Sequence, residues 1–280
     1  MTAATGGYVR QLATFTTESL AQLVGAPSHS RRAIAARRLS RDGTLLVAGC
    51  GLAILVLMLF VDVPTIGAMP RRGAASLWPV RILTDFARPG YVLQTTGALV
   101  LIIVFVVPLL QGVWRSLATA LGVRISFIFM AVAIPNLVTE CLKGFIGRGR
   151  PFVGGAANAF NYSPLTWSEQ FASLPSSHAV TGFALAFAVS AVWPRTRYVM
   201  AFYALLMALS RIVLLAHHPS DVVAGALVGV VGAMFVRQWF AARRLGFVIG
   251  ADGRIHPLPD TSFARLKGIA TRPKPVRAEL

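Results

Sequence analysis

The chain has 280 residues, of which 55% are hydrophobic and 13% are charged, and its formal net charge is +17. This composition is too apolar for an ordinary soluble domain and is typical of a membrane protein. The positive charge would suit nucleic acid, but the basic residues flank apolar runs and no recognition motif accompanies them, which argues against nucleic-acid binding.

Residues 1–43 form a basic segment ahead of the first apolar run. The segment contains no apolar core followed by a cleavage-site pattern, so we expect no removable signal peptide and a mature chain of full length. Basic flanks favour the cytoplasmic side of a membrane. The arginines just before the first run are Arg31, Arg32, Arg37, Arg38 and Arg41.

Six apolar runs follow, each close to the roughly 20 residues that a helix needs to cross a bilayer. They lie at residues 44–61, 95–113, 125–142, 178–194, 198–217 and 219–236. We therefore predict an all-α protein with six transmembrane helices over residues 44–240 and a cytoplasmic tail over 241–280. Cys50 and Cys141 fall inside the runs and are interpreted as small apolar residues rather than a disulfide.

Six spans place both termini on one side of the membrane, and the basic flanks place that side in the cytoplasm. The connections 62–94, 143–177 and the short turn 217–219 then face outward. The sequence thus predicts an integral protein of a bacterial inner membrane, with its unusual polar residues exposed to the periplasm or the outside.

The outward segment 62–94 contains Trp78, Ile82 and Phe86 at helical spacing between charged residues. This pattern predicts a short helix lying in the membrane interface. Two roles remain open for it: a brace packed on the bundle, or a lid that contacts a substrate.

The first polar cluster is KGFIGRGRP at 143–151, which leaves the outer end of the third span. Lys143, Arg148 and Arg150 could be no more than a basic edge of the membrane domain. Positive charge on the outer side runs against the usual orientation bias, however, so a bound anion would account for it better.

The second cluster is LPSSHAVTG at 174–182, which opens the fourth span. Ser176 and Ser177 could simply cap the helix. His178 in the first turn suggests more, because a helix N-terminus attracts phosphate and a nearby histidine can supply a proton.

The third cluster is SRIVLLAHHPSD at 210–221, between the fifth and sixth spans. Spacing alone leaves His217 and His218 nearly tied as partners of Asp221. Pro219 suits the first position of a helix and disfavours a helical conformation at the residue before it, so a count of helical faces fails at this turn.

The tail after residue 245 contains a possible ADG turn and then the basic stretch RPKPVR. This composition is typical of a small hairpin or of a disordered basic end.

Together the clusters supply the parts of a phosphoryl-transfer site: cations and N–H groups for phosphate oxygens, one histidine as nucleophile, another as acid, and an aspartate to orient the nucleophile. Asp221 fits the orienting role through a hydrogen bond to one ring nitrogen. The chain has only ten Asp and Glu residues and they do not group, so the sequence indicates no metal site and no cofactor.

These clusters resemble the three motifs of the type 2 phosphatidic acid phosphatase superfamily, which includes bacterial lipid phosphatases and vanadium haloperoxidases. Lys, six residues and Arg-Pro match 143–151, and Pro-Ser-Gly-His matches 175–178 except at its third position. Ser-Arg, five residues, His, three residues and Asp match 210–221. The resemblance covers roughly residues 44–240.

The resemblance implies a six-helix bundle with an outward-facing site and a phosphohistidine intermediate. By this likeness His217 attacks, Asp221 orients it and His178 protonates the leaving oxygen. The implied phosphate ligands are Lys143, Arg150, Ser176, Ser177 and Arg211.

Two positions fall outside the family pattern. Ser177 stands where the family has glycine, and it could add a hydroxyl donor or reshape the pocket. Arg148 lies between the motif residues and is interpreted as an ion-pair partner of Glu140 or Asp85.

A site at the mouth of a membrane bundle predicts a lipid phosphate substrate: a phosphatidate, phosphatidylglycerol phosphate, an isoprenyl pyrophosphate or a lipid A phosphate. The loop 152–174 is expected to help select among them. Alternatives are a phosphotransferase that uses the same site, a non-catalytic lipid-binding or transport protein, and a haloperoxidase, which nothing in the chain favours.

Overall fold

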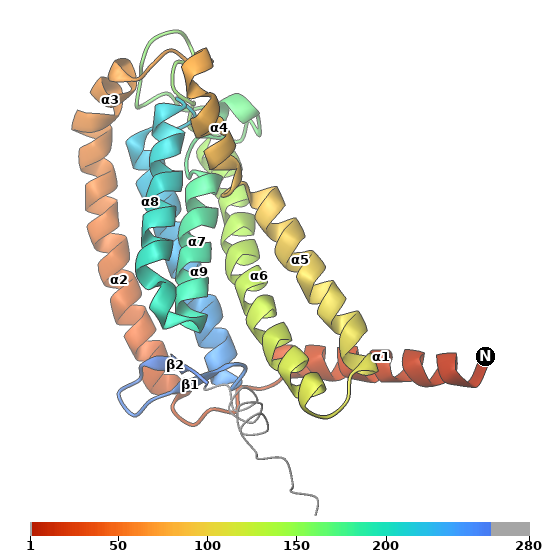
Figure 1. The fold of residues 1–280 in the computed structure, drawn as a ribbon. Helices are drawn as coiled ribbons and strands as arrows, with labels where there is room; N and C mark the ends of the chain where they lie inside the picture. The colour runs from red at the N-terminus through yellow and green to blue at the C-terminus, as the bar shows by residue number, and fades with distance from the viewer. Residues whose placement is uncertain (1, 259–280) are drawn as a thin grey trace, which may run out of the picture.

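The computed structural model describes residues 2–258, which form a helical bundle with one small β-hairpin (Figure 1). The helices are α1 (Thr2–Val24), α2 (Arg32–Val56), α3 (Asp62–Ala68), α4 (Trp78–Asp85), α5 (Pro89–Val106), α6 (Gly112–Ile146), α7 (Ser177–Val192), α8 (Arg197–Val213) and α9 (Pro219–Ala242). The strands are β1 (Phe247–Ile249) and β2 (Ile255–Pro257), and a π-helical turn, Leu57–Val61, joins α2 to α3.

The all-α fold class is confirmed, and the protein is an integral membrane protein. Within residues 2–258, five helical stretches are long and apolar enough to span a membrane: Arg32–Ala68, Ala75–Leu109, Gly112–Ile146, Pro194–Val213 and Pro219–Ala242. The predicted number of six full spans is not reproduced, because α7 has only 16 residues. This helix lies inside the bundle, where it packs on α6, α8 and α9 (Figure 1).

Small residues let α7 and α9 approach closely. A Cβ added at Gly225 would lie 2.6 Å from the carbonyl oxygen of Ser176, and one added at Gly229 would lie 2.5 Å from that of Val180. The first contact is with the segment that opens α7, so the packing of these two helices also sets the position of the second motif.

Replacing Gly225 with valine is expected to destabilise the protein by about 1–3 kcal/mol, since the added atoms overlap backbone that cannot move independently. The melting temperature Tm in detergent measures the effect. Gly51→Val is the matched control, because a Cβ at Gly51 has no heavy atom within 4 Å outside its own helix. Equal values of Tm for the two variants would contradict the close-packing interpretation.

The two ends of the bundle differ. One end, here called the site end, carries α3, α4 and the loop 147–176 (Figure 1). At the opposite end α1 runs past the end of α5 and projects sideways from the bundle, and the β-hairpin packs on α9 (Figure 1). The hairpin confirms one of the two structures predicted for the tail, whereas the basic stretch at 272–277 lies outside the described residues.

The short helix predicted in the segment 62–94 is present as α4, and its place in the membrane interface stays a prediction. Trp78 and Ile82 of α4 and Phe86, the residue after its end, are all exposed, and the buried residue of the helix is Thr84. The Thr84 hydroxyl accepts hydrogen bonds from Ser210 at 3.0 Å and from Arg211 at 3.1 Å. This helix therefore braces the third motif directly.

Candidate active site

The three motif segments meet at the site end because α6 finishes there while α7 and α9 begin there (Figure 1). Gly147 ends α6 with φ 61°, a left-handed conformation that favours glycine. A Cβ at Gly147 would lie 2.0 Å from the carbonyl oxygen of Ser163, so a side chain has no room here. The chain thus turns sharply just before Arg148 and Arg150.

Cations from two motifs surround both candidate histidines. The charges of Arg211, Arg150 and Lys143 act on His217, which is 3% exposed in the turn between α8 and α9. The same three charges act on His178 in the first turn of α7. The structure therefore brings together the cations and histidines that the sequence placed in separate clusters.

Several polar groups in this cluster are buried and lack a hydrogen-bond partner within residues 2–258: Arg150 Nε, Arg211 Nε and Ser176 Oγ. Ser176 precedes the first residue of α7 but makes no side-chain capping bond, so the simple capping interpretation is wrong for it. Buried donors without partners are costly, and a phosphate with its several acceptor oxygens would satisfy them.

Lys143 and Ser177 are linked to each other and to an acidic residue. Lys143 Nζ lies 2.9 Å from Glu140 Oε1 and donates to Ser177 Oγ, which also donates to Glu140 at 3.0 Å. The serine at the glycine position of the family motif thus contributes a hydroxyl that bridges this ion pair.

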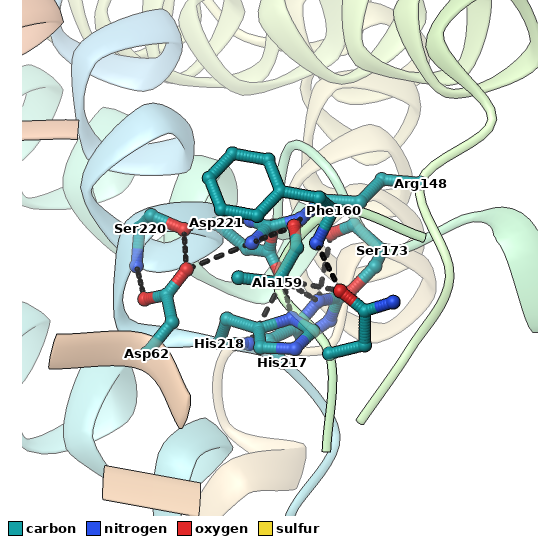
Figure 2. Close-up of polar contacts among 10 residues, drawn as sticks. Asp62, Arg148, Ala159, Phe160, Ser173, His217, His218, Ser220 and Asp221 are labelled. Carbon is teal, nitrogen blue, oxygen red and sulfur yellow. Dashed lines mark hydrogen bonds and ion pairs between the residues drawn. The ribbon is translucent and has the colours of Figure 1, made fainter. Parts of the chain in front are cut away.

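Asp221 does not hydrogen-bond to His217 in the way that the sequence predicted. The nearest carboxylate oxygen is 3.9 Å from His217 Nδ1, which instead lies 2.8 Å from the carbonyl oxygen of Ser173 (Figure 2). The same oxygen of Asp221 is occupied by the Ser173 hydroxyl at 2.6 Å and by the His218 amide at 2.8 Å. Ser173 therefore connects Asp221 to His217, with its hydroxyl on the carboxylate and its carbonyl oxygen on the ring.

The bond to Ser173 defines the tautomer of His217. A carbonyl oxygen only accepts, so Nδ1 carries the proton and Nε2 keeps a lone pair. Burial lowers the pKa of His217 well below its usual range, with Asp221 opposing the shift and Arg211 reinforcing it. The ring is therefore neutral at pH 7, which is the form that a nucleophile needs.

His218 lies beside His217 but has different contacts (Figure 2). Its Nδ1 is 3.1 Å from Asp221, and its backbone and side chain form a capping box with that residue at the start of α9. No hydrogen-bond partner for its Nε2 lies within the described chain. Through these contacts His218 caps the N-terminus of α9.

Arg148 is fully buried and holds two carboxylates at once (Figure 2). Its guanidinium lies 2.5 Å from Asp221 and 2.7 Å from Asp62, and it donates to the carbonyl oxygen of Ala159 at 2.9 Å. The predicted pairing with Glu140 or Asp85 is wrong, because Glu140 is paired with Lys143 and the buried carboxylates satisfy the guanidinium.

Asp62 is a charged residue of this cluster that lies outside the three sequence motifs. It lies at the start of α3, is 0% exposed, and accepts hydrogen bonds from the Ser220 amide at 3.0 Å and from the Ser220 hydroxyl. In the sequence, the one sign that Asp62 has a special role is its place as a single carboxylate directly after the first apolar run. Between residues 2 and 258, this cluster included, no three His, Cys, Asp or Glu side chains are grouped so as to hold a metal ion.

Comparison with known families agrees with this arrangement. The model of the PAP2 superfamily matches residues 124–245, which contain all three motifs. Residues 124–245 belong to the PAP2 superfamily. The matched part begins in α6 and ends after α9. Asp62 contacts the site but lies outside the matched residues.

Similar proteins support the same family. The lipid A 1-phosphatase of Rhizobium johnstonii is 33% identical over 141 residues, or 50% of this chain and 58% of that protein. The lipid A 1-phosphatase of Rhizobium etli is 32% identical over 141 residues, 61% of its length. The bacitracin transport permease protein BcrC of Bacillus licheniformis is 27% identical over 135 residues, 64% of its length. The match therefore spans about three fifths of these relatives, and no solved structure matches significantly.

Proposed function

We propose that this protein is a metal-independent phosphatase that removes phosphate from a lipid through a phosphohistidine intermediate. The observation that carries the proposal is the cluster of Arg150, Arg211 and Ser176, whose buried donors lack partners beside two histidines. Cations and hydroxyls in this arrangement are suited to the oxygens of a phosphoryl group.

The chemistry follows from the positions of the two histidines. The negative charge of the bound phosphate offsets the cations around His178 and lets this ring carry a proton. Nε2 of His217 attacks phosphorus, the bond from phosphorus to the lipid oxygen breaks, and His178 gives that oxygen its proton. Water then attacks the phosphorus and loses a proton to His178, and the bond from phosphorus to Nε2 breaks, which releases inorganic phosphate and restores His217. Lys143 and the arginines compensate the charge on the phosphate oxygens in both steps.

A lipid substrate is supported by the place of the site at one end of a membrane bundle, where a headgroup can enter while its chains stay in the bilayer. Two relatives carry the name lipid A 1-phosphatase. We place residues 44–240 in the catalytic membrane domain, with the basic segment 1–43 and the tail 241–280 in the cytoplasm and the site facing the periplasm.

The test is phosphate release by the purified protein from a panel of lipid phosphates in the presence of EDTA. We expect turnover to resist EDTA and to be inhibited by vanadate, which adopts the five-coordinate geometry of the transition state. Rapid quenching in base with a labelled substrate is expected to trap phosphate on histidine. Loss of turnover with EDTA that added metal restores would contradict the proposal.

Two further measurements separate the alternatives. An added lipid acceptor that gains the phosphoryl group would identify a phosphotransferase. Vanadate binding without hydrolysis of any lipid phosphate would indicate a binding or transport protein.

A further inference from the structure

A cleft of about 670 Å³ opens beside the candidate active site. Pro151, which follows Arg150, and Leu215, two residues before His217, form part of its wall. The lining also includes Arg71 and Arg72, which belong to the chain after α3. The volume is in the range of cavities that hold small ligands.

The two arginines of this cleft lack acidic partners. Both side chains are exposed, and neither has an ion pair with another residue in the described part of the chain. The charge of Arg72 acts on both Arg150 and Arg211, and with burial it lowers the pKa of Arg150. The positive field of the phosphate site therefore extends into the cleft.

A tight turn positions the arginine pair. The amide of Ala74 donates to the carbonyl oxygen of Arg71 at 3.1 Å, which closes a four-residue turn. Gly73 is its third residue and has φ 90°, a conformation typical of a type II turn and favourable for glycine. Gln170 adds an amide to the same cleft, and its backbone carbonyl accepts from the Arg150 amide at 2.9 Å.

We propose that this cleft is a second anion subsite, in which Arg71, Arg72 and Gln170 bind a further phosphate of the substrate headgroup. Guanidinium groups bind phosphate in paired hydrogen bonds. The cleft lies next to Arg150, the proposed ligand of the scissile phosphate, because Pro151 is part of its lining. The substrate class is then a lipid with at least two phosphates. This inference rests on the proposed function and names its substrate class.

The test compares substrates that differ by one phosphate. Farnesyl diphosphate is paired with farnesyl monophosphate, and a disaccharide lipid with two phosphates is paired with its one-phosphate form. For R71A/R72A we expect KM for a two-phosphate substrate to rise about tenfold or more, with kcat and the one-phosphate substrates within about twofold. Arg72→Lys, which keeps the charge but not the paired hydrogen bonds, is expected to give an intermediate KM.

Arg81→Ala is the matched control, because Arg81 is an exposed arginine of α4 at the same end of the bundle and outside the lining of the cleft. An effect confined to farnesyl diphosphate assigns the subsite to a phosphate bonded to the scissile one, and an effect confined to the disaccharide lipid assigns it to a remote phosphate. Equal effects on one-phosphate and two-phosphate substrates, or an equal effect of Arg81→Ala, would overturn the subsite. Absence of hydrolysis by the wild-type protein would instead reject the proposed function, and this inference with it.

Discussion

Replacement of His217 with alanine is expected to reduce kcat for phosphate release by at least about 10⁴-fold, since removal of a covalent nucleophile removes the reaction path itself. The bond from His217 Nδ1 to the Ser173 carbonyl, 2.8 Å long, leaves Nε2 as the free base. Single-turnover assays with a lipid phosphate measure the loss. Base-stable labelled phosphate should disappear from the protein in the same variant.

His218→Ala is the matched control for this prediction. His218 is fully buried, and its Nδ1 contacts Asp221 at the start of α9. We expect its loss to lower Tm and to reduce kcat about tenfold to a hundredfold, through disturbed positioning of Asp221, while labelled phosphohistidine still forms. Phosphohistidine in His217→Ala and none in His218→Ala would exchange the two roles.

Arg148→Ala is expected to destabilise the protein by about 3–5 kcal/mol, because it leaves the carboxylates of Asp62 and Asp221 buried without their common cation. The guanidinium is 0% exposed, so water cannot replace it without rearrangement of the surrounding helices. Thermal unfolding in detergent measures the loss of stability, and the yield of folded protein is expected to fall with it.

Arg150→Ala provides the comparison, with the same substitution two residues further along the loop. Arg150 has a donor without a partner and forms no ion pair within residues 2–258 that the substitution would break, so Tm is expected to change little while phosphate release falls at least about a hundredfold. A large drop of Tm in Arg150→Ala, or an unchanged Tm in Arg148→Ala, would contradict the division between a phosphate ligand and a structural ion pair.

The sequence predicted the fold class and the grouping of the polar clusters because both depend on local signals. Apolar runs define membrane helices, and the direction of successive spans brings 143–151, 174–182 and 210–221 to one end. The length of α7 was less predictable. Its apolar run continues into Trp193, but the helix ends at Val192 because the chain turns into a 3₁₀ segment beginning at Pro194.

The sequence predicts which residues belong to the site better than it predicts the contacts among them. Asp221 lies four residues after His217, a spacing that suggests a direct bond on one helix. The new helix at Pro219 instead directs the carboxylate to His218, which caps that helix, and to Ser173, which lies 48 residues earlier in the chain and which helical spacing does not bring near it. The ion pair between Asp62 and Arg148 spans 86 positions of sequence, so no local pattern predicts it.

The position of Asp62 has a consequence for biosynthesis. Its carboxylate is made 86 residues before Arg148 and 158 residues before Ser220, its partners in the finished protein. During synthesis the first hydrophobic helix must therefore hold an acidic group at its end until the last one has been inserted. A fragment limited to residues 124–245 would lack Asp62 altogether. The stretch that matches the family model therefore contains Arg148 but only one of the two carboxylates that pair with it. The buried cluster around Asp62 can therefore form only after α9, which carries Ser220, has been inserted.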